Sequence, residues 1–440
     1  MVAASGYLLD RHGPKTAVAG PIEATETGAW FCPHGGTSGG HGWVVVTNPG
    51  GTDATIRLTT FGKNGVRRLS SFVASAGQQV YREVPATEAG ASTEVEYFGG
   101  WVGAAAIVQG GKSKPGLAGE RCTPRPRGSW FLPDQPTGRG ESGLAVVMNP
   151  FSTPAQFNVV IRTERRTISP QDLTPFVLPP RTSAAIDLDR YALETPGQTT
   201  VTTEIVQRLG RVVAGSFASA PGGLRAEVGE PSLERRWVIP GTDQSDSGGV
   251  VMMNPGRGRA DVTLIRQGAS VQEVLSGEDG LSVAPGYVLT FKAEHMDGAG
   301  LQVESTNRGR IATAAVLTGP GMDTATMDGA STPVSTWLVM PTLPADGGQG
   351  VLILQNPGRA AVDLSIQIIG ANGTLGLTGI GARTVPAGRT LVIPLRTSTG
   401  FPVSAIVRTK VGTIVAAGAS YVDDGAGYAA TLGLPMTDSG

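Results

Sequence analysis

The sequence predicts an all-β protein made of four tandem immunoglobulin-like β-sandwich repeats of about 100 residues. An apolar run that ends in Asn-Pro occurs four times, and a tryptophan stands 17 to 19 residues ahead of each copy. The steps from one such tryptophan to the next are 100, 107 and 100 residues. Short runs rich in Val, Ile and Thr alternate with turns drawn from 64 Gly and 31 Pro, and no useful helical periodicity interrupts them.

Each repeat begins with a tryptophan, apolar neighbours and a proline, and a polar, Gly-rich loop leads to the strand that ends at Asn-Pro. We expect the tryptophans to pack in the cores, because a residue that recurs at one place in a repeat is more often structural than functional. The Asn side chain can cap its own turn while Pro fixes φ. The structural repeat positions are Trp30, Trp130, Trp237 and Trp337, with Asn48, Asn149, Asn254 and Asn356.

Strict alternation follows each Asn-Pro turn, as in Ala54, Ile56 and Leu58. A period of two predicts a strand with one buried face, and the turn makes it the antiparallel partner of the preceding strand. A later Pro-Ala-Gly-like turn and further short strands complete about seven strands per repeat. The last strand is small and apolar, as in residues 104–108.

The joints between repeats are short and contain no Gly/Ser linker, so neighbouring repeats must abut. The sequence leaves open whether they form a stiff row or a compact ring. A four-bladed propeller-like ring is the alternative architecture, although 100 residues is about twice what four strands need. The expected divisions are an N-terminal tail or added strand (1–27) and repeats at 28–127, 128–234, 235–334 and 335–440.

Composition limits the possible functions. The net charge of −1 gives no bulk field that would attract nucleic acid or an anionic membrane. No run of about 18 apolar residues exists to span a bilayer. The chain has four histidines, and its sequence shows no carboxylate pair of the kind that a glycosidase uses. We therefore expect no enzyme, no catalytic residue and no cofactor.

The only two cysteines, Cys32 and Cys122, bracket the first repeat. The first and last strands of a sandwich can be neighbours, which predicts a disulfide and an extracytoplasmic location. Two buried thiols are the alternative. Zinc is not expected, because Cys32 with His34 and His41 lacks a visible fourth ligand.

Two kinds of surface site remain as candidates. Trp43 and Trp101 lie outside the repeat register, so they are the better candidates for surface contact, for example with a sugar, and burial is the alternative for both. Asp243, Asp246 and Asp346 lie in the polar loops ahead of the Asn-Pro strands and could bind a cation or sugar hydroxyls. Ordinary connecting loops are the simpler interpretation of those three acids.

The pattern of Trp30, Pro33, Asn48 and Pro49, repeated through nearly the whole chain, resembles an actinobacterial family of unknown function. The resemblance implies an exported protein tethered by one N-terminal membrane helix and often encoded beside large membrane glycosyltransferases. It supplies no catalytic residues. We therefore expect the native protein to carry an anchor ahead of this chain, and to contact the membrane only through it.

Taken together, these features favour a non-enzymatic extracytoplasmic scaffold of the cell envelope. Its expected partner is an envelope protein, in particular a membrane glycosyltransferase, or wall glycan. An array of carbohydrate-binding modules is the alternative function. A hydrolase or transferase remains as a third hypothesis, and it predicts a deep cleft between domains lined by at least two acids.

Overall fold

The computed structural model describes residues 26–192, 200–241, 247–277, 279–294, 296, 298–319, 323–344, 348–375, 381–395, 402–422 and 427–436. Nearly all of the tail expected at 1–27 lies outside these residues. Among the described residues, no helix has the length and apolar character needed to cross a membrane.

The strands and short helices form four units, and each unit contains a similar set of strands. The first unit contains β1 (Thr27–Cys32), β2 (His41–Thr47), β3 (Ala54–Gly62), β4 (Gly65–Ala74), β5 (Gln79–Val84), β6 (Ser92–Phe98), β7 (Gly103–Gln109) and β8 (Leu117–Arg121). The second contains β9 (Ser129–Pro136), β10 (Ser142–Asn149), β11 (Ala155–Arg162), β12 (Thr167–Ile168), η1 (Gln171–Leu173), β13 (Phe176–Leu178), β14 (Thr182–Asp187), α2 (Asp189–Ala192), β15 (Thr200–Leu209), β16 (Val213–Ala220) and β17 (Gly223–Val228).

The third unit contains β18 (Arg236–Ile239), β19 (Ser247–Met253), β20 (Ala260–Gln267), β21 (Gln272–Val274), β22 (Leu281–Val283), β23 (Val288–Glu294), β24 (Gly300–Ser305), β25 (Ala312–Thr318) and β26 (Thr324–Asp328). The fourth contains β27 (Thr336–Val339), β28 (Gln349–Asn356), β29 (Val362–Gly370), β30 (Gly373–Leu375), β31 (Ala382–Val385), β32 (Arg389–Leu395), β33 (Ser404–Thr409), β34 (Val415–Tyr421), β35 (Tyr428–Leu432) and β36 (Leu434–Met436).

Two antiparallel sheets make up each unit. In the first unit the outer sheet has the order β1-β6-β3-β4 and the inner sheet the order β5-β2-β7-β8. The same two orders recur, with β14-β10-β16-β17, β23-β19-β25-β26 and β32-β28-β34-β35 as the other inner sheets. The apolar positions of the alternating runs face inward, and Ile56 and Leu58 are buried in β3. The prediction of an all-β, sandwich-like fold is therefore confirmed.

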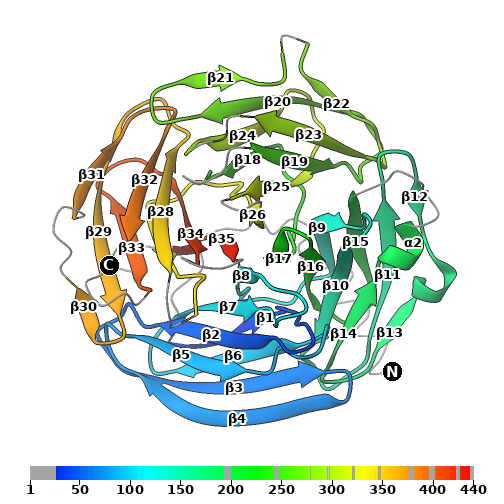
Figure 1. Ribbon diagram of the computed structural model, residues 1–440, viewed down its shortest axis with the longest axis horizontal. Helices are drawn as coiled ribbons and strands as arrows, with labels where there is room; N and C mark the ends of the chain where they lie inside the picture. Colours follow the sequence, from blue (N-terminus) through cyan, green and yellow to red (C-terminus); the bar gives the residue numbers. More distant parts are fainter. Residues whose placement is uncertain are drawn as a thin grey trace, which may run out of the picture.

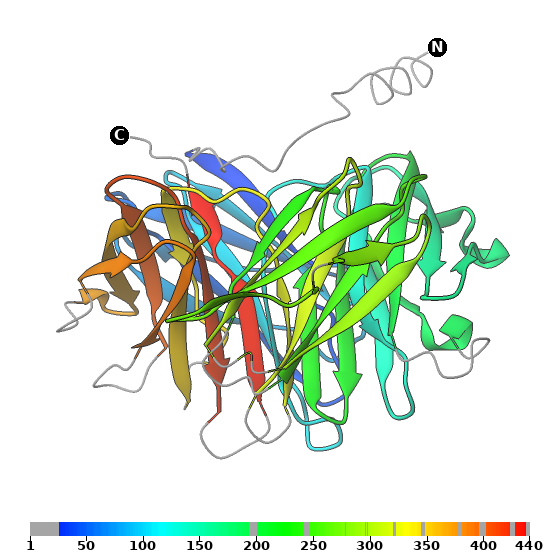
Figure 2. The ribbon, with the colours of Figure 1, turned by 90° about the horizontal axis from the view of Figure 1, so that it is seen from above.

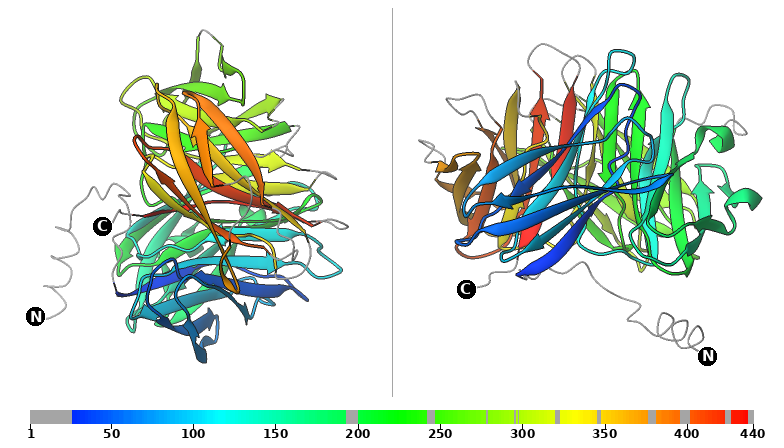
Figure 3. Two further views of the ribbon diagram at one scale, coloured as in Figure 1. Left: turned by 90° about the vertical axis from the view of Figure 1, so that its left-hand side faces the viewer. Right: turned by 90° about the horizontal axis from the view of Figure 1, so that it is seen from below.

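The four units close into a ring around a central axis (Figure 1). The last strand of each inner sheet lies at the centre. In sequence around the axis, β8 packs against β17, β17 against β26, β26 against β35, and β35 against β8. The views from above and below show these four inner strands running through the thickness of the ring, with turns at both ends (Figures 2 and 3). The structure thus selects the ring over the row.

Neighbouring units meet through equivalent surfaces, because the outer sheet of each unit contacts the inner sheet of the next. Ser92 of the first unit bonds Ser183 of the second, with 2.7 Å between the hydroxyl oxygens. At the closing interface, Ser404 of the fourth unit lies 2.7 Å from the Thr47 hydroxyl of the first. Gln355 bonds Gln267 across the third interface at 2.8 Å. A polar contact inside an otherwise apolar interface fixes the angle at which units join.

Candidate functional site

The four repeat tryptophans are buried and perform the same task in every unit. Each indole Nε1 donates to a backbone carbonyl at the start of the strand that follows the outer sheet, at 2.7 or 2.8 Å. A buried indole needs such a partner, because its N–H would otherwise be unsatisfied. The acceptors are Val102, Val212, Ile311 and Ile414. These tryptophans organise the cores and offer no surface to a ligand.

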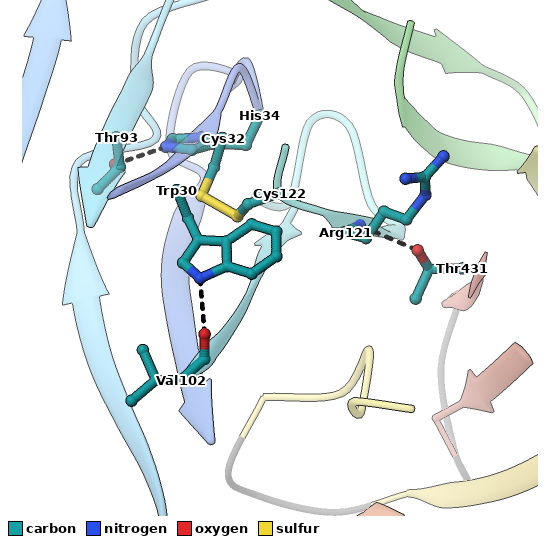
Figure 4. Close-up of a disulfide and its surroundings, with 8 residues drawn as sticks. All are labelled: Trp30, Cys32, His34, Thr93, Val102, Arg121, Cys122 and Thr431. Atoms are coloured by element: carbon teal, nitrogen blue, oxygen red, sulfur yellow. Dashed lines mark hydrogen bonds between the residues drawn. A yellow bond between two sulfur atoms is a disulfide. The ribbon is translucent and has the colours of Figure 1, made fainter. Parts of the chain in front are cut away.

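Cys32 and Cys122 form the predicted disulfide, which joins the end of β1 to the residue after β8 beside Trp30 (Figure 4). Backbone bonds between Phe31 and Thr123 flank it. In the other units glycines stand at the position of Cys122, and a Cβ on Gly229, Gly329 or Gly433 would meet Leu132, Ile239 or Val339, respectively. The disulfide therefore takes the place of an apolar side chain packed on a glycine.

The repeat asparagines build their turns with one geometry. In Asn254 the Nδ2 donates to the carbonyls of Gly258 and Val283, both at 2.9 Å, and the Oδ1 accepts from Gly256 N at 3.0 Å. Asn48, Asn149 and Asn356 repeat this pattern. Each side chain thus caps its own turn, as the sequence indicated, and it also ties that turn to the end of a strand in the other sheet.

Trp101 corrects one expectation, because it is buried rather than available for surface contact. Only 7 % of its surface is exposed, and its ring lies edge-on to Trp30 with 6.1 Å between the ring centroids. The first unit has a second tryptophan in its core, which a search for repeat positions could not reveal. Trp43 is half-buried and stacks on the exposed His41 at a centroid distance of 6.1 Å.

Charged side chains converge on the ring axis, and we call this set the axial cluster. The Arg121 guanidinium pairs with Asp328 at 2.6 Å and lies 3.9 Å from Glu230. Asp134 accepts from Arg225 at 2.9 Å and from the Thr326 hydroxyl at 2.8 Å. The cluster consists of Glu120, Arg121, Asp134, Arg225, Glu227, Glu230, Thr326 and Asp328.

Burial dominates the electrostatics of the axial cluster. It raises the pKa of Glu120 and of Glu227 well above the ordinary value, and nearby carboxylates raise both further. Burial also raises the pKa of Glu230 to about 8, against the opposing effect of Arg121. Neither carboxyl oxygen of Glu120 has a hydrogen-bond partner. Five acids share two guanidinium groups, so burial favours the protonated form of Glu120, Glu227 and Glu230.

The axial cluster cannot receive a substrate in this arrangement, because its carboxylates are 1–5 % exposed. General acid–base chemistry needs a group that reaches the reacting atom. The groups belong to different units, so their evident effect is to hold those units together. Within the described residues, no group of three or more His, Cys, Asp or Glu side chains is arranged to hold a metal ion.

Two cavities of about 250 Å³ open at the end of the ring opposite the Asn-Pro turns. One lies in the fourth unit and is lined by apolar residues such as Met340 and Leu343, with Gln349 and Ser420. The other lies in the first unit beside Arg67 and Glu88. Neither has a pair of acids in its lining, so neither is the cleft that the hydrolase hypothesis predicts.

The remaining sequence candidates do not come together. His34 is buried and bonds Thr93 at 3.0 Å, and burial lowers its pKa to about 4. His41 lies on the surface against Trp43, and Cys32 is bonded to Cys122, so no zinc site forms from these residues. The loop acids Asp243, Asp246 and Asp346 lie outside the described residues.

Sequence reasoning missed the axial cluster, although one signal pointed to it. The closing strands of the inner sheets carry charged residues among apolar ones, and Glu120 and Glu227 stand at the same register position in two of them, opposite Ala106 and Ser216. Charged residues in such a strand indicate either an exposed face or a buried polar contact. Because these strands line the ring axis, their charged residues form a buried polar contact and not an exposed face.

Comparison with known proteins identifies one family. The model of a family of unknown function, DUF5719, matches the chain twice, over residues 83–304 and over residues 222–435. Together the matches run from residue 83 to residue 435, or 353 of the 440 residues. Two overlapping matches to one model fit a chain built from repeated units. No curated protein matches the chain.

Proposed function

The chain belongs to the DUF5719 family of unknown function, and we propose that the protein is a non-enzymatic scaffold that presents the surfaces of its ring to a partner in the cell envelope. The observation that carries this proposal is the sealed axis. The side chains best suited to acid–base chemistry are buried between units, where they hold the ring closed. A ring whose axial charged groups are buried between its units favours binding over catalysis.

The location in the cell follows from the disulfide. A bond between Cys32 and Cys122 indicates an oxidising environment outside the cytosol. In the proposal, an N-terminal anchor holds the ring at the membrane, and a membrane glycosyltransferase for wall glycan is the partner.

Cross-linking in native membranes tests the scaffold proposal. The purified chain, with its disulfide intact, is cross-linked to envelope membranes and the bound polypeptides are identified by mass spectrometry. The expected result is one saturable membrane partner with glycosyltransferase activity, absent when the chain is reduced and unfolded. The same chain is incubated alone with wall glycan fragments, where no conversion is expected. Turnover of a fragment by the chain alone would contradict the proposal.

Carbohydrate binding is a second candidate function, and one observation favours it. Trp43 and His41 stack at the surface of the first unit and form a small aromatic platform. The equivalent position of Trp43 in the second unit is Leu144, so an array of identical sugar sites is not supported. Binding to wall glycan that survives Trp43→Ala would exclude this platform as the site.

A further inference from the structure

One end of the ring collects basic side chains, and the near-neutral net charge of the whole chain conceals this. We call it the Asn-Pro face and define it by the turns at 48–53, 149–154, 254–259 and 356–361, with the neighbouring turns at 99–102, 209–212, 306–311 and 409–414. The strand register brings both sets of turns to the same end of each unit, because Thr47 pairs with Gly103 and Thr27 with Phe98.

All four units point the same way, so their Asn-Pro turns share one face. At the opposite end, Thr324 N bonds the Gly222 carbonyl at 2.7 Å, and Gly427 N bonds Asp323 at 2.6 Å. These contacts join equivalent hairpins of adjacent units. Both ends of the described chain also lie on the Asn-Pro face, since β36 ends opposite the first residue of β27.

The basic side chains of this face are exposed and largely unpaired. Within the described residues, no ion pair joins Arg257, Arg308 or Arg359 to a carboxylate. In the third unit, Asn307 ties the loop of Arg308 to the loop of Arg257 through a bond to Arg259 O at 3.0 Å. The loops that carry Arg257 and Arg308 are therefore joined to each other by a hydrogen bond.

A second group of arginines lies at the joint between the first two units. Backbone hydrogen bonds in both directions join Arg127 to Val212, so Arg125, Arg127 and Arg211 meet at this joint. The pKa of Arg127 is lowered first by burial and then by the charges of Arg125 and Arg211. Like charges that gather at one place raise the local positive potential, which attracts an anion from outside the chain.

Large apolar side chains stand among these charges. Phe151 and Leu209 are 42 % and 44 % exposed in the second unit, and Val411 is 82 % exposed at a turn tip of the fourth. Both cavities described above lie at the other end of the ring. Basic residues combined with protruding apolar side chains match the chemistry of a membrane interface.

We propose that the Asn-Pro face lies against an anionic phospholipid bilayer, with the arginines at the headgroups and Phe151, Leu209 and Val411 inserted at the interface. This contact is additional to any membrane anchor. It also does not depend on the protein partner proposed above. Headgroup phosphates neutralise the guanidinium groups of Arg257, Arg308 and Arg359, and the three apolar side chains leave water. The ring would then sit flat on the membrane, with its cavities facing away.

Vesicle sedimentation tests this contact with the purified 440-residue chain. Binding to vesicles of phosphatidylglycerol and phosphatidylcholine is compared with binding to phosphatidylcholine alone, at low and high salt. We expect binding only to the anionic vesicles, and weaker binding at high salt. Arg257→Gln with Arg308→Gln should lower partitioning roughly 25-fold, at about fivefold for each charge. Arg67→Gln with Arg68→Gln, two exposed arginines of β4 outside the face, should change it less than twofold.

A second set of variants tests how much the apolar side chains contribute to vesicle binding. Phe151→Ser with Leu209→Ser should weaken vesicle binding severalfold, whereas Val66→Ser, an equally exposed valine at the other end, should not. Equal binding to both kinds of vesicle, or an equal loss in the Arg67 and Arg68 control, would overturn the proposal. So would tight binding to soluble polyglutamate that is indifferent to Phe151 and Leu209, because that result identifies an acidic polymer or protein as the occupant.

Discussion

Arg121 of the first unit and Asp328 of the third form an ion pair across the ring axis, with 2.6 Å between the guanidinium and the carboxylate. They are 207 residues apart in sequence and belong to units that are not neighbours in the chain. Both side chains are largely buried, at 17 % and 6 % exposed. The pair therefore links opposite sides of the ring directly, while the sheet interfaces link only adjacent units.

Removing one member of this pair should destabilise the ring. Arg121→Met leaves Asp328 buried without its cation, which typically costs about 3–5 kcal/mol. Adding Asp328→Leu should recover at least half of that loss, because two apolar side chains leave no charge unpaired. Urea unfolding monitored by tryptophan fluorescence measures both changes. As a control, Lys292→Ala breaks an exposed pair with Glu294 and should cost well under 1 kcal/mol. A similar loss in the control and in Arg121→Met would refute the special role of the axis.

Stability should fall as pH rises, because the axial acids hold protons in the folded ring. The folded pKa values of Glu120, Glu227 and Glu230 are raised, the last to about 8. In the pH range between the unfolded pKa of about 4.3 and the folded pKa, the folded state binds more protons, so its stability decreases. The contribution is fully present below the unfolded pKa and is lost once the pH passes about 8 for Glu230.

Glu120→Gln separates this effect from general charge repulsion. The amide keeps the shape of the protonated acid and cannot ionise, so the variant should be more stable than the parent at pH 8 by on the order of 1–3 kcal/mol, and about equal at pH 5. Urea unfolding at pH 5, 6.5 and 8 provides the comparison. The exposed Glu88→Gln should leave the pH profile of the parent unchanged. A parent whose stability increases from pH 5 to pH 8 would disprove the assignment.

Loss of the disulfide should cost stability without changing the fold. Cys32→Ile with Cys122→Gly copies the pair that the third unit has at this place, so packing is retained and the cross-link alone is lost. A bond that spans 90 residues is worth about 2–5 kcal/mol by its effect on the unfolded chain. Thermal unfolding with and without reductant measures this, and reductant should no longer lower the Tm of the variant. A variant as stable as the oxidised parent would contradict the prediction.

Substituting a repeat asparagine should lower the free energy of unfolding more than substituting an ordinary turn residue near the surface. Asn254→Ala removes three hydrogen bonds and leaves the buried Val283 carbonyl unsatisfied, at a cost of about 2–3 kcal/mol. Asn64, exposed in the β3–β4 hairpin, provides the matched control, and Asn64→Ala should cost less than 0.5 kcal/mol, roughly the limit for surface positions. Chemical denaturation of the two variants distinguishes a structural Asn from an ordinary turn residue.

Local pattern was sufficient to predict the repeated unit, but not how its strands pair. The strand after each Asn-Pro turn, such as β3, joins the outer sheet, so the prediction that it pairs with the inner strand before the turn, such as β2, is wrong. Trp237 and Asn254 act within their own unit, through hydrogen bonds to Ile311 and Val283, so the same pattern in each repeat produces the same geometry. The disulfide was predictable for the same reason, because Cys32 and Cys122 lie at the first and last strands of one sandwich.

Contacts between units could not be predicted, because they depend on the angles at which units join. Asp134 shows this well, since it follows a repeat tryptophan yet bonds Thr326 of the next unit. Trp101 was misjudged for a different reason. A residue outside the repeat register has no counterpart to reveal its burial, and only the packing against Trp30 shows that it belongs to the core.

Ring closure between the first and fourth units underlies both the scaffold and the common face. Thr47 and Ser404 meet at that interface, 357 residues apart in sequence, with 2.7 Å between their hydroxyl oxygens. The most direct test is therefore to oxidise the variant Thr47→Cys with Ser404→Cys and to map its disulfides by mass spectrometry. The closed ring predicts an intramolecular bond between positions 47 and 404 in the monomer, beside the native Cys32–Cys122 bond. Two free thiols, or bonds only between separate molecules, would show that the units form an open row.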